Sequence, residues 1–303
     1  MLLRVENLHV QFTGDRDPVR AVDGVSLTLD AGQTLALVGE SGCGKSLTAL
    51  AILRLLPPAA RIADGSIHFD GEDVLRLPER ELRNLRGNRL AMIFQEPMTS
   101  LNPLHTAGAQ IDEVLRLHRR LSADAARTQT IDLLRLVGIP APAQRYGDYP
   151  HQLSGGMRQR VMIALALACG PELLIADEPT TALDVTVQAQ ILALLHALQR
   201  ERGLALLLIS HDLALVARFA DRVVVMYAGC VVETGPAPAV FAEPRHPYTQ
   251  ALLRCTPRLD AAGVGPGRLP VIPGEVPSAA TRPAGCAFHP RCERVGADVP
   301  CHT

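Results

Sequence analysis

The stretch GESGCGKS, residues 39–46, decides how the rest of the chain is interpreted. It matches the pattern G-x-x-x-x-G-K-[ST], in which glycines let successive backbone N–H groups point inward at phosphate oxygens. It follows an apolar run, TLALV (34–38), and leads into a run with helical spacing, SLTALAILRLL (46–56). This order suits the pattern, because the start of a helix favours a bound anion. The sequence therefore predicts a phosphate-binding loop that consists of Gly39, Glu40, Ser41, Gly42, Cys43, Gly44, Lys45 and Ser46.

A second motif supplies carboxylates for the same chemistry. LLIADEP (173–179) is an apolar run that ends in Asp177 and Glu178. Lys45 is expected to neutralise the β- and γ-phosphates of ATP, while Ser46 and Asp177 hold Mg²⁺. Glu178 is expected to polarise the attacking water. The two motifs together predict an enzyme that hydrolyses ATP.

The pattern of apolar runs predicts an α/β fold. Short continuous runs are typical of strands buried on both faces of a parallel sheet, here 34–39, 173–177 and 205–210. Alternating runs predict an antiparallel β layer, here 3–12, 25–32 and 65–73. Helical spacing without a strand signal over 106–137 predicts a separate helical lobe, inserted at about 96–160. The run RVVVMYAGCVVETG predicts a hairpin with its turn at Ala228–Gly229.

Composition excludes several classes of protein. The chain has 30 basic and 31 acidic residues and no Trp, so neither its charge nor its aromatic content indicates a nucleic-acid partner. No apolar stretch approaches the roughly 20 residues of a spanning helix, and the N-terminus lacks the apolar core of a signal peptide. These features predict a cytosolic protein whose role at a membrane depends on partners.

The stretch LSGGMRQR (153–160) resembles the signature of ABC transporter ATPases. Ser154 suits a helix N-cap, and Gly155 and Gly156 expose N–H groups at the helix start, which would make a second anion site. The resemblance implies a P-loop NTPase core in a head-to-tail dimer that encloses two ATP molecules. In such a dimer, Ser154, Gly155 and Gly156 meet the γ-phosphate bound by the partner.

Four further positions match the ABC pattern and take their expected roles from it alone. Gln95 matches the Q-loop glutamine that contacts Mg²⁺ or water, and His211 matches the switch histidine that contacts the γ-phosphate. Asp184 matches the D-loop aspartate, and Phe12 is the candidate for stacking on adenine. The resemblance thus implies Glu178, His211 and Gln95 as the catalytic residues.

Two other stretches, QEPMTSLNPLHTAGAQI (95–111) and RHPYTQALL (245–253), resemble ATPases of oligopeptide, dipeptide and nickel importers. The likeness is to the first of two paired ATPase subunits. It implies a heterodimer with a paralogous ATPase, two transmembrane permeases, an extracytoplasmic binding protein, and a place on the cytoplasmic face of the membrane. The resemblance does not decide the cargo, which could be dipeptides, longer peptides, nickel or another small solute. A soluble ABC ATPase without a transport role is the alternative.

The last quarter of the chain differs in composition. We expect an ABC ATPase domain over 1–235 and an extension over 236–303, which carries more than half of the 23 prolines. Its segment GCAFHPRCERVGADVPC (285–301) lacks the close cysteine pair of structural zinc sites. The resemblance favours a [4Fe–4S] cluster, for which the tail offers Cys286, Cys292 and Cys301 as ligands. The fourth ligand stays open: Cys255 could serve if the chain folds back, and His289 and His302 are weaker candidates. A proline-rich tail with free thiols is the other interpretation.

Overall fold

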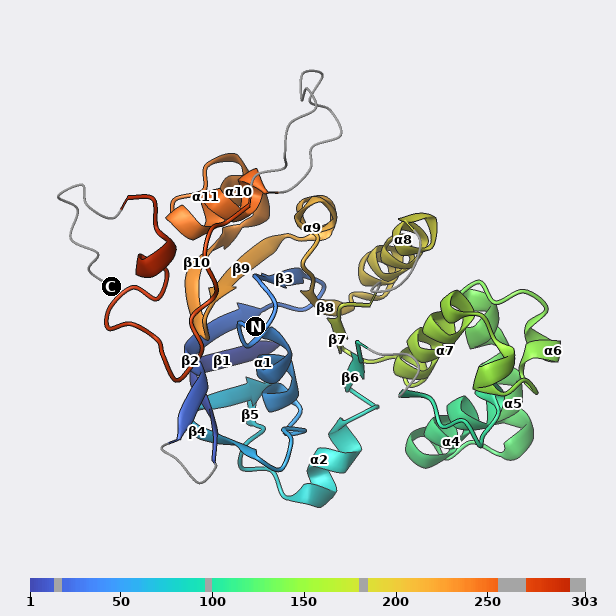
Figure 1. The fold of residues 1–303 in the computed structure, drawn as a ribbon. Coiled ribbons are helices and arrows are strands. Elements are labelled where there is room, and N and C mark those ends of the chain that lie inside the picture. The colour runs from blue at the N-terminus through green and yellow to red at the C-terminus, as the bar shows by residue number, and fades with distance from the viewer. Residues whose placement is uncertain (14–17, 96–99, 180–184, 256–270, 295–303) are drawn as a thin grey trace.

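The computed structural model describes residues 1–13, 18–95, 100–179, 185–255 and 271–294, and these form two sheets with helices around them (Figure 1). The smaller sheet has the order β2-β1-β4-β5. Its strands are β1 (Leu3–Phe12), β2 (Val19–Leu29), β4 (Ala60–Phe69) and β5 (Glu72–Asp73), and β1 pairs antiparallel with both β2 and β4. This confirms the predicted antiparallel layer.

The larger sheet has the order β10-β9-β3-β8-β7-β6. Its strands are β3 (Thr34–Val38), β6 (Leu90–Ile93), β7 (Leu173–Asp177), β8 (Ala205–Ile209), β9 (Arg222–Tyr227) and β10 (Cys230–Pro236). All pairs are parallel except β9 with β10. Every residue of β3, β7 and β8 is buried, as the continuous apolar runs predict.

Two features of this sheet differ from the sequence prediction. β6 was not predicted, because a run of four residues carries no periodicity of its own. β9 and β10 form the predicted hairpin, with Ala228 (φ 45°) and Gly229 (φ 87°) in the turn, but β9 also pairs with β3. The hairpin is therefore part of the parallel sheet rather than a separate unit.

Helices cover the sheets as a β–α alternation requires. Beside the sheets lie α1 (Lys45–Ile52), α2 (Glu79–Leu85), α8 (Val185–Arg202) and α9 (Leu213–Phe219). The predicted helix over 46–56 ends sooner, because Arg54 adopts a left-handed conformation at φ 52°. Gly203 follows α8 with φ 66°, as predicted for a C-cap glycine.

A group of helices projects from one side of the parallel sheet (Figure 1). It comprises α4 (Ala107–Arg119), α5 (Ala123–Leu136), α6 (Pro142–Arg145), a short 3₁₀ turn (Pro150–Gln152) and α7 (Gly155–Leu167). The predicted stretch 106–137 is two helices, since Arg120 is left-handed (φ 55°) and Ser122 caps α5 by accepting from the Ala125 N–H. Ile111, Leu115 and Leu134 are fully buried, in agreement with their helical spacing.

The C-terminal part packs on β9 and β10. It contains α10 (Ala237–Ala242), α11 (Pro247–Arg254) and a 3₁₀ turn (His289–Arg291). Tyr227 of β9, Tyr248 of α11 and Phe288 form a buried aromatic cluster, with ring centroids 4.5 to 5.3 Å apart. In Figure 1 the red segment runs back beside β10 toward β2. Within the described residues, every helix falls short of the length and apolarity needed to cross a bilayer.

Gly108, in the first turn of α4, generates a prediction about the packing of the helical group. A Cβ placed there would lie 2.2 Å from the Tyr146 ring, whose hydroxyl is held by Asp112 at 2.6 Å. Gly108→Ala should therefore lower the free energy of unfolding by roughly 1–3 kcal/mol through overpacking. Denaturant unfolding measures this, with Gly147→Ala as the control, since a Cβ there meets only an atom at 3.8 Å. Equal stability of the two variants would contradict the prediction.

Candidate functional site

The predicted site residues follow neighbouring parallel strands. The phosphate-binding loop comes after β3, and His211 comes shortly after β8. Asp177 ends β7, Glu178 follows it, and Gln95 comes shortly after β6. Because β3, β8, β7 and β6 are adjacent in that order, their carboxyl ends meet at one edge of the sheet. The fold thus brings together residues that are far apart in the sequence.

The loop after β3 has a backbone that only glycine permits at two positions. Gly39 has φ 149°, and a Cβ there would lie 2.1 Å from the carbonyl oxygen of Met226. Gly44 has φ 101°, and a Cβ there would lie 2.9 Å from the carbonyl oxygen of Ala21. These glycines let the loop turn tightly against β9 and β2 before α1 begins.

Lys45 carries a buried charge whose described hydrogen-bond partners are neutral. Its side chain is 5% exposed, and Nζ donates to the carbonyl oxygens of Gly39 and Glu40, each at 2.9 Å. Nζ also lies 3.6 Å from Sγ of Cys43. The Asp177 carboxylate is close enough for its charge to interact with the ammonium, but it is not among the described hydrogen-bond partners of Nζ. A buried ammonium is costly without a directly bonded counter-charge, so this environment suits a bound anion such as phosphate. Cys43 is itself fully buried, and burial raises the pKa of its thiol, which keeps it protonated and unreactive.

Ser46 and Asp177 form a pair of oxygen ligands. The Ser46 hydroxyl donates to Oδ1 of Asp177 at 3.1 Å, and Asp177 is 4% exposed. Burial raises the pKa of the Asp177 carboxyl, and the neighbouring charge of Glu178 adds to this. The hydrogen bond from Ser46 and the positive charge of Lys45 oppose the rise without cancelling it. Hard oxygen atoms and an excess of negative charge are what Mg²⁺ requires, so these residues fit that ion.

Glu178 lies at the centre of the predicted catalytic residues. Gln95 donates from Nε2 to its Oε2 at 2.9 Å, and Nδ1 of His211 lies 3.4 Å from its Oε1. The backbone of Glu178 is left-handed at φ 45°, and its N–H donates to the carbonyl of Ile209 at 3.0 Å. A non-glycine residue in this conformation is strained, and the bond to the end of β8 helps to hold it there.

The signature residues lie at the start of α7. The Ser154 hydroxyl accepts from the Met157 N–H at 3.3 Å, which is the predicted N-cap, and Ser154 and Gly155 are exposed. Figure 1 shows α7 among the projecting helices, apart from α1. Ser154 and Gly155 are thus accessible at the start of a helix that does not belong to the phosphate-binding loop. Phe12 ends β1, half-buried, and pairs with Val19 and Ala60, while Asp184 lies outside the described residues.

Comparisons with known proteins agree with this geometry. A family model described as ABC transporter matches residues 22–181, and one described as the C-terminal region of oligopeptide/dipeptide transporters matches residues 232–298. The chain belongs to the ABC transporter family. It is 54% identical over 291 residues to the dipeptide transport ATP-binding protein DppD of Escherichia coli, with 96% of this chain and 88% of the relative covered. It is 52% identical over 292 residues to DppD of Bacillus subtilis, with 96% and 86% covered.

Solved ABC cassettes share the fold. The dimeric cassette MJ0796, in a post-hydrolysis state with ADP and Pi, superposes with a TM-score of 0.71 at 27% identity, covering 78% of this chain and 99% of the cassette. The protein cbiO1 of Clostridium perfringens, part of the transporter complex cbiONQ, superposes with a TM-score of 0.67 at 28% identity, covering 80% and 91%. The P-loop NTPase core of the ABC type is thereby confirmed.

The iron–sulfur prediction has no support in this ABC protein. Cys255, Cys286 and Cys292 are free and half-buried, and Cys301 lies outside the described residues. Among the residues that the structure describes, no three His, Cys, Asp or Glu side chains are grouped to hold a metal ion. The described part of the tail therefore does not fit a cluster.

Two residues that contact the phosphate-binding loop were not predicted from the sequence. Tyr248 accepts a hydrogen bond from the Glu40 N–H, and Arg291 forms an ion pair with the Glu40 carboxylate. Tyr248 belongs to the quoted HPYT segment, but the sequence showed no link from it to the loop. Nothing in the sequence pattern around Arg291 indicated this contact, because its partner is 251 residues away.

The buried carboxylate of Asp177 generates a prediction about stability. Asp177→Asn should raise the free energy of unfolding of the nucleotide-free protein by about 1 kcal/mol, as is typical when a strained active-site charge is removed. The variant removes a desolvated negative charge beside Glu178, and its amide still accepts from Ser46. The attraction between Asp177 and Lys45 is lost as well, but desolvation and the charge of Glu178 outweigh it, as the raised pKa of Asp177 indicates. Denaturant unfolding measures the change, with Glu201→Gln on the exposed end of α8 as the control. An Asp177→Asn protein less stable than the parent would show that this carboxylate stabilises the fold.

Proposed function

We propose that this chain is the ATP-binding and hydrolysing subunit of an ABC importer for dipeptides or oligopeptides. The observation that carries the proposal is the gathering of Lys45, Ser46, Asp177 and Glu178 at one sheet edge, with Gln95 and His211 on Glu178. The peptide cargo is supported by the relatives named dipeptide transport ATP-binding proteins. We place the ATPase domain at 1–235 and the importer-type extension at 236–303.

In this proposal the phosphate-binding loop holds the ATP phosphates. The Lys45 ammonium exchanges the carbonyl oxygens of Gly39 and Glu40 for phosphate oxygens, and the N–H groups of residues 39–46 surround them. Ser46 and Asp177, with Gln95, would hold Mg²⁺, which when bound offsets the negative charge of the phosphates. Phe12 is the residue proposed to stack on the adenine.

Hydrolysis is assigned to Glu178. Its carboxylate accepts a proton from a water molecule, whose oxygen bonds to the γ-phosphorus as the bond to the bridging oxygen breaks, releasing ADP and phosphate. Gln95 and His211 hold the two carboxylate oxygens at 2.9 and 3.4 Å, which orients the base. His211 is exposed, so it is also accessible to the γ-phosphate.

The exposure of Ser154 and Gly155 supports a head-to-tail dimer. Ser154, Gly155 and Gly156 would contact ATP bound by a partner subunit, as would Asp184, and the dimeric form of the MJ0796 cassette supports this arrangement. The proposed partners are a paralogous ATPase, two permeases that engage the helical lobe, and an extracytoplasmic binding protein. The proposed location is the cytoplasmic face of the membrane.

The first test removes the base. Glu178→Gln should reduce the rate of ATP hydrolysis at least 100-fold, roughly the contribution of a general base, while ATP binding is retained. Steady-state phosphate release and equilibrium binding of ATP measure the two effects, and Glu201→Gln is the control. A Glu178→Gln protein that hydrolyses ATP at half the parental rate would refute this role.

The second test addresses the cargo. Co-expression with the permeases, binding protein and second ATPase of a peptide importer from the same organism should restore uptake of labelled dipeptides to a strain that lacks its own peptide importers. The same cells carrying Glu178→Gln should show no uptake above background. Uptake of nickel and not of peptide would replace the peptide cargo, and purification with ribosomes rather than permeases would favour the non-transport alternative.

A further inference from the structure

Glu40, the second residue of the phosphate-binding loop, is held mainly from the C-terminal extension. Its backbone N–H donates to the hydroxyl oxygen of Tyr248 at 2.9 Å. Its carboxylate accepts two bonds from Arg291, at 2.8 and 3.1 Å. Its carbonyl oxygen accepts from Nζ of Lys45 at 2.9 Å. Each polar group of Glu40 thus has a partner, and two of the three come from the extension.

Arg291 is rigidly placed to make this contact. Its side chain is 4% exposed, and it also donates to the carbonyls of Ile272 and Pro273, at 3.2 and 2.9 Å, and to the Tyr227 hydroxyl at 3.3 Å. Burial lowers the pKa of the guanidinium, but its bonds to Glu40 and Tyr227 outweigh this and raise the pKa overall. Arg291 therefore stays charged, and its two-pronged bond fixes the orientation of the Glu40 carboxylate.

Tyr248 fixes the backbone of the same residue. It is fully buried, with its ring against Tyr227 at 4.5 Å and Phe288 at 5.3 Å. Burial raises the pKa of its phenol, so the hydroxyl stays neutral and its oxygen accepts from the Glu40 N–H. The aromatic cluster thus sets the position of the loop through a buried hydrogen bond.

The position of Glu40 matters to the nucleotide for two reasons. Its carbonyl and that of Gly39 hold the Lys45 ammonium, so a shift of Glu40 moves the lysine that faces the phosphates. Its carboxylate is also a negative charge in the loop that binds an anion. Arg291 neutralises that charge at hydrogen-bond distance, which removes a repulsion from the phosphates.

We infer that Arg291 and Tyr248 are positioning residues for the phosphate-binding loop, so that the C-terminal extension forms part of the ATP site. This inference rests on the proposed ATP-binding function. It assigns the extension a direct role in nucleotide affinity, whichever cargo the transporter carries.

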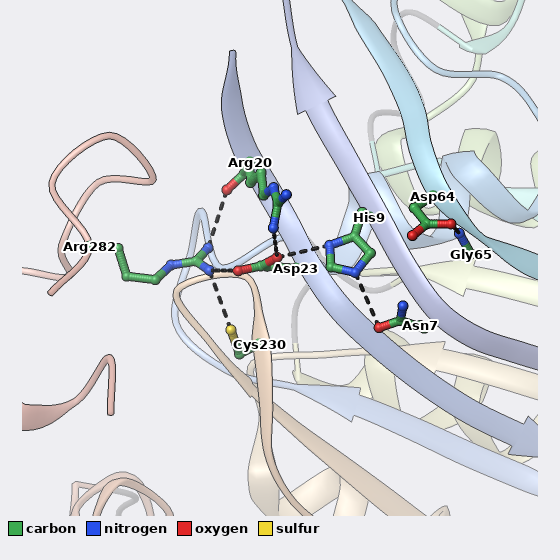
Figure 2. A network of polar contacts seen from close by, with 8 residues as sticks. All are labelled: Asn7, His9, Arg20, Asp23, Asp64, Gly65, Cys230 and Arg282. Atoms are coloured by element: carbon green, nitrogen blue, oxygen red, sulfur yellow. Dashed lines mark hydrogen bonds and ion pairs between the residues drawn. The ribbon is translucent and has the colours of Figure 1, made fainter. Parts of the chain in front are cut away.

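A second arginine of the extension, Arg282, attaches it to the ATPase domain at another place (Figure 2). It therefore provides a control that distinguishes positioning of the loop from docking of the extension. Arg282 donates to Oδ2 of Asp23 at 2.5 Å and to the Arg20 carbonyl at 3.2 Å, and its Nη1 lies 3.4 Å from Sγ of Cys230. Asp23 in turn bonds to Nδ1 of His9 at 2.8 Å. Arg282 thus fastens the extension to β2 and β10, and none of these described contacts involves Glu40.

The experiment measures binding of Mg·AMP-PNP, a non-hydrolysable ATP analogue, to the full-length purified chain by calorimetry. Arg291→Lys, which keeps the charge but loses the two-pronged bond, should raise the Kd roughly tenfold. Tyr248→Phe, which removes only the acceptor, should raise it roughly fivefold. Two variants serve as controls, and their Kd should stay within about twofold of the parental value. They are Arg282→Ala and Arg254→Ala, and the Arg254 side chain pairs with Glu293 at the surface. In the assembled transporter, Arg291→Lys should raise the KM for ATP and leave kcat within about twofold.

A double-mutant cycle tests whether Arg291 acts through Glu40. In a Glu40→Gln background, Arg291→Lys should have much less further effect on the Kd, because the charge pairing and the two-pronged bond are already lost and only one acceptor oxygen remains. An undiminished effect there, unchanged affinity in both Arg291→Lys and Tyr248→Phe, or an equal loss in Arg282→Ala would each overturn the inference. If Arg291→Lys does not fold, as judged by circular dichroism, Tyr248→Phe alone decides. A parental chain that binds no nucleotide would instead overturn the proposed function, and the inference with it.

Discussion

Parallel pairing of β6, β7, β8 and β3 is the constraint on which the site depends. Strands buried on both faces leave no room for charged side chains along their length, so polar residues collect where the strands end. In parallel strands those ends lie on one edge, which is why Gln95, Asp177, His211 and the phosphate-binding loop meet there. The residues come from four segments of the chain. Each segment lies at or directly after the end of one of these strands, so the parallel register of the four strands determines where the residues lie.

The charges at that edge are arranged for a ligand rather than for the stability of the empty protein. Lys45 is buried against carbonyl oxygens, and Asp177 and Glu178 are adjacent carboxylates, one of them nearly inaccessible. Glu178 also has a left-handed backbone. Each feature opposes folding in isolation, and the surrounding apolar strands hold them in place. A bound metal ion and triphosphate would satisfy the lysine and the carboxylates at once.

The sequence predicted the elements whose signals are local. The loop at 39–46 sits between a strand and a helix that are visible as runs of a few residues, and the strand before Asp177 is equally clear. The four-residue β6 and the break at Arg120 were missed, because neither changes the pattern over a long enough window. The family resemblance alone assigned Gln95 and His211 to the ATP site, and their contacts with Glu178 were not predicted. The contact between Arg291 and Glu40 was beyond prediction, since no periodicity or spacing links residues of different segments that meet only after folding.

The ion pair between Glu40 and Arg291 has a consequence for synthesis of the chain on the ribosome. The two residues are 251 positions apart, and at about 5–20 residues per second the arginine is added many seconds after the loop has emerged. Once β10 (Cys230–Pro236) has been made, the sheet, α1 and the glycine turn have all the residues they need to fold, but the carboxylate of Glu40 still lacks its partner. The nascent subunit thus acquires its complete nucleotide loop late. A chain released from a ribosome that stalls before Arg291 would contain every ATPase motif. Its phosphate-binding loop would lack the ion pair between Glu40 and Arg291.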